Sequence, residues 1–558
     1  MRPTGGQRTE RSEPSNCNMS HPSPACGGGT APKPPVRGAQ SREGAPSSTL
    51  GALMRRKHLL WPFLLLALAA ACDEPSADAA PDAAPDAAPD ADATTDVPDV
   101  SDLDAAPDVP ADVTTDVPDV PEDVGPIYPL ERGLPDTELL GTRRGWRIAR
   151  GLVHLHTIHS HDACDGEPRI DGLPNTACDD DWRVGVCSDR LDFVFNTDHE
   201  ELGAWEELET LLLMRPGDEP LQEDGATTAA RLVCPDGFRV LVLPGGEYGV
   251  MPVGLKRHIE GTPEEREAKY EEVTPDRVAS LKELGAVVLQ AHTESKSLDE
   301  LRGLGLDGFE IYNLHANIDP DIREEFLGLD AFGYANDLAP FLRNNGPAPD
   351  LALLAFFAEN PVALQTFDTL LAEGQHLVGT AGTDAHQNAI PFPLRDGERG
   401  DSFRRMMRFF SHHLLVQEVA PQALRDALRQ GRLYIAFEVL GTPEGFDYHA
   451  QAGAVVEMGG EVLLADAPTL HVQAPTVLGW DGPLTLETRL LRAAPGGAVE
   501  VARTTDAALT YTPTEPGAYR VEVRITPHHL RPWLGAGQDP VRYLKPYVWI
   551  YANPIYVR

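Results

Sequence analysis

The sequence predicts an α/β domain built on a parallel sheet or barrel, preceded by a disordered acidic linker and followed by a smaller all-β sandwich. Three observations support this fold class. Short apolar segments alternate with amphipathic helical segments between residues 146 and 441. From about Ala454 the pattern changes to short alternating strands separated by turn residues. Ahead of both lies a stretch of Asp, Pro and Ala repeats without Lys or Arg.

Length and charge set the first limits on function. The chain has 558 residues, more than a single hydrophobic core usually holds, so two or more domains are expected. It carries 86 Asp and Glu against 47 Lys and Arg, a formal net charge of -39. Proteins that bind a nucleic-acid backbone need a basic surface, so we expect no nucleic-acid polymer as the main partner. No apolar run reaches the roughly 18 residues that indicate a membrane-spanning helix.

Residues 54–72 have the three parts of a secretory signal. Basic residues come first, an apolar run from Leu59 to Ala71 follows, and Cys72 ends the segment after small residues. The ending Ala69-Ala70-Ala71-Cys72 resembles the lipobox of bacterial lipoproteins. That resemblance implies that Cys72 is lipidated and that the chain is exported and anchored in the bacterial cell envelope, periplasmic or at the cell surface. The alternative is a plain secretory signal with a chance cysteine.

Two polar stretches flank this signal. Residues 1–53 lack apolar periodicity, and Met54 lies where a signal would begin. We therefore expect residues 1–53 to be a wrongly extended start, with a disordered leader as the alternative. Residues 73–126 contain 17 acidic residues and no Lys or Arg, a composition that cannot bury a core. We expect a disordered, extended tether there, and a cation-binding segment is the alternative.

Short apolar segments mark the strands of the central domain, which is expected over residues 127–450. The eight predicted strands are Ile148–Leu155, Leu191–Asn196, Arg239–Leu243, Ala286–Gln290, Gly308–Tyr312, Leu377–Gly379, His413–Gln417 and Leu433–Phe437. Amphipathic helices are predicted at Thr274–Leu284, Pro361–Gly374 and Pro421–Arg429. This alternation predicts βαβ units, and in such folds functional groups gather at the carboxyl ends of the strands.

Metal-ligating side chains follow five of the predicted strands. They are His154 and His156, then Asp198 and His199, then Glu247, then His292, and finally Asp384 and His386. His154 and His156 are two residues apart, so on a strand both imidazoles lie on one face and can reach one ion. Imidazole and carboxylate ligands from separate strand ends are typical of a site that holds several Zn, Mn or Fe ions.

The order of these residues resembles that of the PHP (polymerase and histidinol phosphatase) superfamily. The matching motifs are His154-Leu155-His156, Thr197-Asp198-His199, Glu247 after a Gly-rich turn, His258, His292, and Gly382-Thr383-Asp384-Ala385-His386. The resemblance covers about residues 146–441. It implies a distorted (β/α)7 barrel that holds two or three divalent metal ions in its mouth, with no catalytic residue beyond the metal ligands.

The resemblance also implies which residues hold each metal. The first metal would be held by His154, His156, Glu247 and Asp384. Glu247 would bridge to a second metal, held by His258 and His292. The third metal would be held by His199, His386 and one residue that follows the HxH motif. For this last ligand Asp162 is favoured over His161, and His159 is a poorer candidate.

Two further roles are expected around the ligands. Asp198 would lie behind the metal ligands and orient a ligand imidazole. Arg257 is a candidate contact for a substrate phosphate, together with Tyr248 and Lys256, because all three follow the Glu247 motif closely.

Four cysteines lie in the folded part, and their even number in an exported chain predicts two disulfides. They are Cys164, Cys178, Cys187 and Cys234, which allow three pairings. A structural zinc site is the alternative, although no CxxC spacing supports it. Three of the four belong to an insertion, residues 164–190, that begins beside the metal ligands. We expect the insertion to form a rim or lid over the site, or else an exposed, disulfide-pinned decoration.

Residues 451–558 are predicted to form a second domain. Their short alternating segments and frequent turn residues predict an Ig-like antiparallel sandwich of roughly seven strands. The ending Trp549–Val557 resembles the close of the sandwich that follows some exported PHP proteins. This domain holds no evident catalytic set, so we expect it to pack against the first domain or to present the substrate.

The expected activity is metal-dependent hydrolysis of a small-molecule ester. A cluster of divalent ions lowers the pKa of a bound water and neutralises charge on the oxygens of the transition state. The resemblance favours a phosphate ester. One alternative is a carboxylic or carbamate ester hydrolase of the same superfamily, and another is a non-catalytic envelope lipoprotein that binds a partner.

Overall fold

The computed structural model describes residues 133–199, 203–535 and 540–558. The expectations for the leader (1–53), the signal segment with its lipidated Cys72 (54–72) and the acidic tether (73–126) lie outside these residues. Within the described ranges, no helix combines the length and the apolar character that crossing a membrane requires.

A strand is present at each of the eight predicted places, and the prediction of a mixed α/β fold is confirmed. These strands are β2 (Trp146–Leu152), β5 (Phe193–Asn196), β8 (Arg239–Pro244), β10 (Val287–Gln290), β11 (Gly308–Asn313), β12 (Val378–Gly382), β13 (Ser411–Val416) and β14 (Leu433–Ala436). Every residue of β5 and β10 is buried, which explains why their sequences are nearly continuous apolar runs. β2 ends at Leu152, earlier than predicted, so His154 and His156 follow the strand instead of lying on it.

The strands form two main hydrogen-bonded sheets in this part of the chain. In the larger sheet, β13, β2, β5 and β8 lie side by side, with β2, β5 and β8 parallel. An unpredicted hairpin of β6 (Glu219–Glu223) and β7 (Ala226–Val233) extends this sheet beyond β8. The second sheet has the order β9 (Met251–Val253), β10, β11, β12, and its last three strands are parallel. A bridge between Gly245 and Val253 connects the end of β8 to β9.

Side chains connect the outer edge of β12 to the larger sheet. Asn553 accepts a hydrogen bond from the backbone N–H of Gly379 (2.8 Å) and donates one to the carbonyl of Gly379 (2.9 Å). His412 accepts a hydrogen bond from the N–H of Ala381 through Nε2 (3.0 Å). These bonds satisfy backbone groups that a neighbouring strand would otherwise pair. They join the two sheets at a second place, distinct from the bridge at β9.

The three predicted helices cover these sheets. They are α6 (Pro275–Glu283), α11 (Pro361–Ala372) and α13 (Pro421–Gln430). Each begins with a proline, whose missing N–H has no helical partner at that position anyway. α13 ends at Gly431, which adopts the left-handed conformation (φ 72°) that favours glycine. Its buried face packs against β13, β10 and β12.

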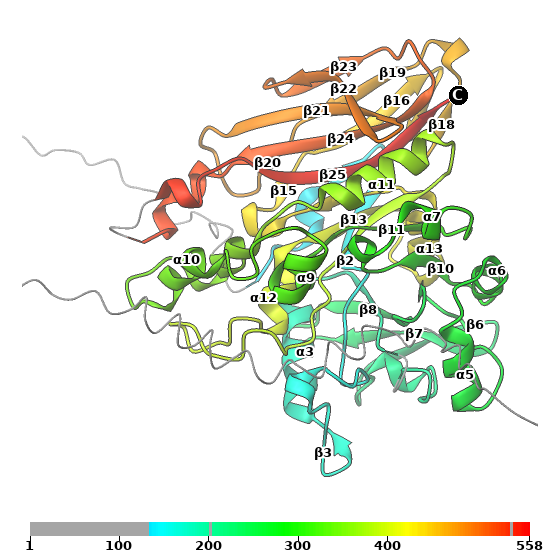
Figure 1. The fold of residues 1–558 in the computed structure, drawn as a ribbon, viewed down its shortest axis with the longest axis vertical. Helices are drawn as coiled ribbons and strands as arrows, with labels where there is room; N and C mark the ends of the chain where they lie inside the picture. The colour runs from blue at the N-terminus through cyan, green and yellow to red at the C-terminus, as the bar shows by residue number, and fades with distance from the viewer. Residues whose placement is uncertain (1–132, 200–202, 536–539) are drawn as a thin grey trace, which may run out of the picture. The chain divides into compact units, whose positions relative to one another are not determined.

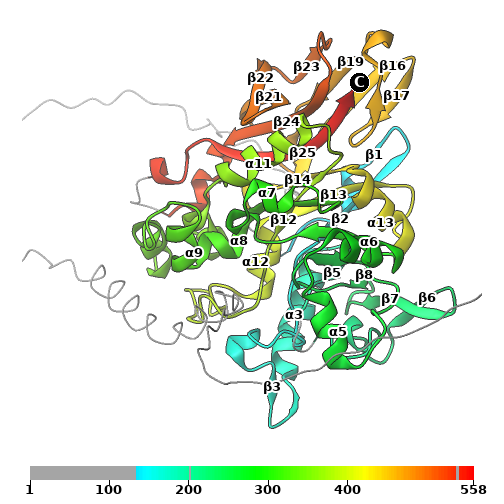
Figure 2. The ribbon, with the colours of Figure 1, turned by 45° about the vertical axis from the view of Figure 1, so that its right-hand side comes forward.

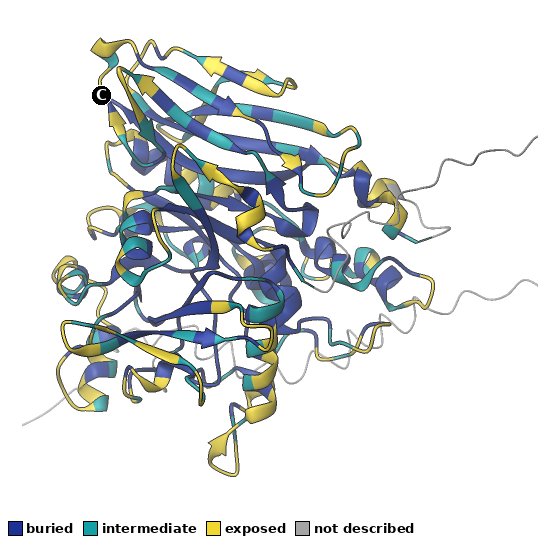
Figure 3. Cartoon of the chain, turned by 180° about the vertical axis from the view of Figure 1, so that it is seen from behind, coloured by how far each residue is buried: buried dark blue, intermediate teal, exposed yellow. Residues whose placement is uncertain are grey.

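Other short elements complete the described part of the chain. The remaining helices are α3 (Thr176–Ser188), α5 (Pro263–Tyr270), α7 (Leu298–Leu301), α8 (Leu314–Ile318), α9 (Pro320–Glu325), α10 (Ala335–Leu338) and α12 (Phe403–Phe409). The short strands are β1 (Thr142–Arg143), β3 (Arg169–Ile170), β4 (Leu173–Pro174), β15 (Pro443–Glu444), β18 (Glu461–Val462) and β20 (Thr476–Val477). Figure 3 shows the buried residues concentrated along the interior strands, whereas the β3–β4 hairpin is largely exposed.

The C-terminal residues form mostly antiparallel strands, with β18 parallel to β25, and some of these strands continue the larger sheet. The order β14, β25 (Tyr547–Val557), β24 (Gly517–Thr526), β21 (Thr485–Ala494), β22 (Gly497–Thr504) runs without a break. A separate four-stranded sheet contains β17 (Ala454–Glu457), β16 (Asp447–Ala452), β19 (Thr469–Gln473) and β23 (Ala508–Tyr511). α11 packs against β21, β22 and β24 (Figures 1 and 2). The C-terminal strands are therefore bonded directly to the α/β part through β25.

Candidate metal centre

The ends of β2, β8 and β12 bring four predicted ligands together. His154 and His156 follow β2, Glu247 follows β8 and Asp384 follows β12. Backbone bonds fix the first and last of these segments to each other: the N–H of Asp384 donates to the carbonyl of His154, and the N–H of His156 donates to the carbonyl of Ala385, both at 3.3 Å. The HxH and GxDxH motifs are thus held in register by their own main chains.

Four possible ligand atoms of these residues lie close together, and five of the six distances among them are between 3.0 and 3.5 Å. His154 Nε2 is 3.0 Å from His156 Nε2, 3.3 Å from Glu247 Oε2 and 3.5 Å from Asp384 Oδ1. His156 Nε2 is 3.2 Å from each of the two carboxylate oxygens. A tetrahedral site with metal–ligand distances of about 2.0–2.1 Å has edges of about 3.3–3.4 Å. The spacing therefore fits one small divalent cation.

The hydrogen bonding of Asp384 supports the same conclusion. Its Oδ1 is buried and accepts no hydrogen bond of normal geometry within the described residues. A buried carboxylate oxygen without a donor is costly, because nothing replaces its lost hydration. A cation among these four ligands would supply the missing partner.

A second ligand group shares both carboxylates with the first. His292 Nε2 lies 3.1 Å from Glu247 Oε1 and 3.2 Å from Asp384 Oδ2. Each carboxylate thus presents one oxygen to the His154–His156 group and its other oxygen to His292. Cations held by the two groups would share both carboxylates. The bridging role of Glu247 stays a prediction, and the two oxygens of Asp384 have the same arrangement.

His258, the other predicted ligand of the second metal, lies on different neighbours. Its Nδ1 is 3.0 Å from the hydroxyl of Tyr270, and its buried Nε2 has no hydrogen-bond partner within the described residues. Burial, helped by the nearby charge of Arg266, lowers the pKa of His258 to about 4. No described contact joins it to Glu247 or His292, so the structure does not bring His258 into this group.

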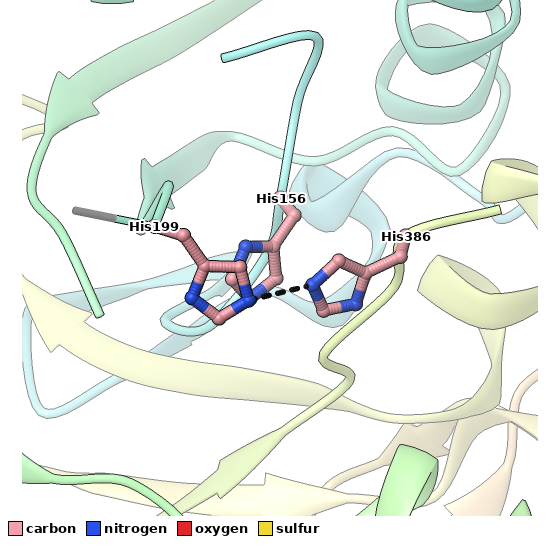
Figure 4. A group of neighbouring side chains, drawn as sticks. All are labelled: His156, His199 and His386. Atoms are coloured by element: carbon pink, nitrogen blue, oxygen red, sulfur yellow. Dashed lines mark hydrogen bonds between the residues drawn. The ribbon is translucent and has the colours of Figure 1, made fainter. Parts of the chain in front are cut away.

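A third group contains His199, His386 and Asp162. The Nε2 atoms of the two imidazoles are 3.2 Å apart (Figure 4), and Asp162 Oδ1 lies 3.3 Å from His386 Nε2 and 3.6 Å from His199 Nε2. Asp162 Oδ1 is buried and accepts no hydrogen bond within the described residues, like Asp384 Oδ1. Of the candidates after the HxH motif, Asp162 is therefore the one whose oxygen joins the imidazoles. The His161 ring lies 5.4 Å from that of His199.

Three residues hold the ligand imidazoles of the first two groups by their Nδ1 atoms. Glu310 Oε1 is 2.6 Å from the Nδ1 of His154, Ser160 Oγ is 2.8 Å from that of His156, and Glu294 Oε1 is 2.9 Å from that of His292. A proton held on Nδ1 leaves the Nε2 lone pair of each ring free for a cation. None of these three residues was predicted.

Asp198 acts on His156 through Ser160. Its carboxylate accepts hydrogen bonds from the hydroxyl of Ser160 (3.0 Å) and from the backbone N–H of Thr157 (2.7 Å). Because the Ser160 hydroxyl donates to Asp198, its oxygen is free to accept the Nδ1 proton of His156. Asp198 thus reaches His156 through Ser160 and touches no imidazole directly within the described contacts.

Charge in the centre is balanced between imidazoles and carboxylates. Burial alone would lower the pKa of His156, but Asp384 and Glu247 outweigh it and raise that pKa to about 9. Burial likewise opposes ionisation of Glu247, yet His154 and His292 hold the pKa of its carboxyl well below the usual value. The buried carboxylates thus favour positive charge at this place, which divalent cations would supply.

One more histidine lies at the centre. His315, on α8, is buried, and its Nδ1 lies 3.2 Å from the backbone carbonyl of Asp384. Together with Asp384 and His386 it forms a group whose ligand atoms are close enough to share an ion. The sequence did not predict His315 at the centre, because α8 is too short to show a helical period.

The three residues expected to contact a phosphate have other neighbours in the structure. Arg257 is exposed, and the amino group of Lys256 pairs with Glu223 at 3.3 Å. Tyr248 stacks on Tyr270, with ring centroids 4.2 Å apart. Within the described ranges, no Lys or Arg forms an ion pair with Asp162, Glu247 or Asp384.

The two predicted disulfides are present. They join Cys164 to Cys178 and Cys187 to Cys234, which selects one of the three pairings and rules out the structural zinc site. The insertion that they pin lies at the edge of the centre, where Asp181 Oδ2 accepts a hydrogen bond from Gln387 Nε2 (3.0 Å), next to His386.

Comparisons with known proteins give little beyond this geometry. No family model and no curated protein matches the chain. A similar solved structure is a two-domain protein containing a predicted PHP-like metal-dependent phosphoesterase from Bacteroides vulgatus, with 13% identity over 75% of this chain and 97% of that one. The TM-score is 0.29, too low to carry an argument. The side chains of the described residues therefore define the site: overlapping groups of His, Asp and Glu that could hold divalent metals, with Asp384 common to three of them.

Proposed function

We propose that this chain is a metal-dependent hydrolase that cleaves a small-molecule ester, with phosphate esters as the first substrate class. It would use two or three divalent ions, Zn, Mn or Fe, in a distorted (β/α)7 barrel of the PHP kind. The observation that carries the proposal is the sharing of Glu247 and Asp384 between the His154–His156 group and His292.

Each part of the centre has a chemical task in this proposal. When bound, divalent cations would lower the pKa of a water molecule and neutralise charge on the ester oxygens. Glu310, Ser160 and Glu294 keep the ligand imidazoles in one orientation and one tautomer. The Nε2 atoms face the shared carboxylates and would bind the cations there.

Burial indicates the side from which a substrate would approach. The side chains of His154 and His156 are fully buried, whereas those of Asp162 and His292 are 17% and 22% exposed. An ester would therefore reach the centre from the side of these two residues. On the opposite side, protein atoms cover the His154–His156 group and exclude bulk water.

A carboxylic or carbamate ester is the second candidate substrate class. The observation in its favour is that no Lys or Arg of the described residues pairs with the ligand carboxylates. Only the metals would then neutralise the negative charge of a phosphate ester. A neutral ester would need no such neutralisation.

Metal analysis followed by an ester panel tests the proposal. We expect two or three equivalents of Zn, Mn or Fe per chain, and turnover of phosphate esters first. Replacing Asp384 and His386 by Ala should abolish both metal uptake and turnover. A folded protein that takes up no supplied metal would contradict the proposal, and activity retained in the variant would place the chemistry elsewhere.

We also propose that the protein is exported and anchored through a lipid on Cys72. The two disulfides support an oxidising compartment. Labelled fatty acid should enter the wild-type protein and fail to enter Cys72→Ser. Equal labelling of the two proteins would contradict the anchor.

A further inference from the structure

The carboxylate of Asp162 has no side-chain hydrogen bond that fixes the oxygen facing the third group. Its Oδ1 lies 3.3 Å from His386 Nε2 but accepts no hydrogen bond within the described residues. Asp162 also belongs to neither a helix nor a strand. Its position near the imidazoles therefore depends on the backbone that carries it.

That backbone is bonded to the segment that carries His386. The N–H of Cys164 donates to the carbonyl of His386 (2.8 Å), and the N–H of Asp165 donates to the carbonyl of Gln387 (3.0 Å). In the opposite direction, Asn388 Nδ2 donates to the carbonyl of Asp162 (3.0 Å). The two ligands are thus carried by neighbouring segments held in a fixed register.

The first of these segments has an unfavourable backbone conformation. Cys164 and Asp165 are both left-handed, with φ of 58° and 60°. Side chains rarely adopt this region, so two successive left-handed residues persist only where the surroundings hold them. Two restraints are present: the disulfide from Cys164 to Cys178, and a two-pronged ion pair from Arg399 to Asp165 at 2.8 and 2.9 Å.

The disulfide connects this segment to a firmly packed helix. Cys178 lies in the first turn of α3, where its N–H donates to the capping side chain of Asn175. Further along α3, Trp182 is buried, and a Cβ at Gly185 would lie 2.7 Å from the sulfur of Met407 in α12 and 3.1 Å from the backbone nitrogen of Arg404. The second disulfide, at Cys187, ties the other end of α3 to Cys234.

We infer that the Cys164–Cys178 disulfide is a clasp that positions Asp162 for the metal held by His199 and His386. This inference rests on the metal-dependent function proposed above. The clasp itself binds no metal and touches no substrate. It fixes the backbone conformation that places the Asp162 oxygen beside the two imidazoles, so the third metal is held tightly only when the disulfide is closed.

The test compares the two disulfides in matched double variants. Cys164→Ser/Cys178→Ser removes the clasp, and Cys187→Ser/Cys234→Ser removes the other bridge. Each purified protein is titrated with Mn2+ or Zn2+, and equivalents per chain and Kd values are measured. Replacing a residue that holds a metal ligand in position typically weakens metal binding about 10–100-fold. We expect a rise of that size in the Kd of the third metal in the clasp variant alone.

Thermal unfolding separates this effect from general loss of stability. The two bridges close loops with sequence separations of 14 and 47 residues, and the longer loop is expected to stabilise more. The control variant should therefore show the larger fall in Tm, measured without metal, yet keep the third equivalent. Asp165→Asn keeps the disulfide and breaks the ion pair with Arg399. It should weaken binding of the third metal less than the clasp variant does. It replaces the clasp variant in the test if that variant does not fold.

Three results would overturn the inference. Unchanged metal binding in both the clasp variant and Asp165→Asn would contradict the clasp while leaving the proposed hydrolase intact. Equal loss of the third equivalent in both double variants would show a general effect of stability. A wild-type protein that binds no metal would contradict the proposed function and the clasp together.

Discussion

Glu310 holds His154 in one orientation, with its Oε1 2.6 Å from the Nδ1 of that imidazole. Its other oxygen accepts a hydrogen bond from the backbone N–H of His292 at 3.1 Å. One carboxylate therefore positions a ligand of the first group and the segment that carries a ligand of the second. The contact depends on Gly382, because a Cβ at that position would lie 2.2 Å from Glu310 Oε1.

Glu310→Gln should weaken metal binding without unfolding the protein. The amide is similar in size but loses the charge that holds the Nδ1 proton of His154. Loss of such a partner typically costs about 10–100-fold in metal affinity. Competition with a chromophoric chelator measures the change. Glu373→Gln, at an exposed ion pair with Arg302, is the control, and equal affinities in the two variants would contradict the role of Glu310.

Glu247→Gln and His292→Ala should give different metal stoichiometries. Glu247 offers an oxygen to each of two groups, so its replacement should release the first and second metals together. His292 belongs to one group only, so its replacement should release the second metal and leave the first. Elemental analysis after dialysis distinguishes them. Loss of a single equivalent from both variants would show that Glu247 does not bridge.

Binding of metal should raise the free energy of unfolding. A ligand that binds only the folded state adds about 2.7 kcal/mol at a concentration of 100 times Kd. Denaturant unfolding with added metal and with a chelator measures the difference. The variant with both Asp384 and His386 replaced by Ala is the control, because it removes ligands from all the groups and the effect should vanish, and an equal shift in that variant would indicate binding elsewhere on the chain.

The eight strands and three helices named from the sequence could be predicted, and so could most of the side chains that the structure brings together at the centre, but the β6–β7 hairpin could not. Apolar runs such as residues 287–290 predict strands directly. The predicted ends of these strands then show which motif residues can lie close together. Glu310 left a weaker signal, a charged residue in the middle of an apolar strand, which is unusual without a partner. That partner, His154, is 156 residues away in the chain, and no local pattern encodes such a distance.

The pairing of strands was harder to predict than the strands themselves. Residues 547–557 have an apolar pattern that fits a sandwich, and the same pattern fits a strand of the larger sheet. Their place beside β14 depends on tertiary contacts, among them the side-chain bonds of Asn553 to Gly379. The pairing of Cys187 with Cys234 is similar, because the sequence allowed three connectivities.

Asn553→Ala should destabilise the fold through β12. The side chain satisfies both backbone groups of Gly379, and each buried group left without a partner costs about 1–3 kcal/mol. The free energy of unfolding should therefore fall by about 2–6 kcal/mol in urea denaturation. Asn345→Ala, at an exposed position, is the control. A change of the same small size in both variants would show that water or rearrangement replaces the lost bonds.

The buried pair of Arg150 and Glu438 should make stability depend on pH. Both side chains are fully buried and 3.0 Å apart. Burial would raise the pKa of Glu438, but Arg150 and His413 outweigh it and lower that pKa to about 2. A carboxyl whose pKa is depressed on folding stabilises the protein above its usual pKa. That stabilisation is lost as the pH falls from about 5 towards 2.

Glu438→Gln tests this directly. Removing one partner of a buried ion pair costs about 3–5 kcal/mol, so the variant should be less stable than wild type at pH 7 by that amount. The difference should narrow as the pH falls, because wild type then loses the same charge. Denaturant unfolding of both proteins at pH 7, 5 and 3, in the presence of a chelator, measures this difference in the free energy of unfolding. A difference that stays constant with pH would contradict the assignment of the charge.

Because β25 lies between β14 and β24, the larger sheet can be completed only after the last strand of the chain is available. The larger sheet cannot close until residues 547–557 have emerged from the ribosome, long after β14 has been made. Until then β14 presents an unpaired edge, and such edges invite pairing with strands of other chains. A chain whose residues 547–557 have not yet paired therefore exposes an edge at which a strand of another chain could add.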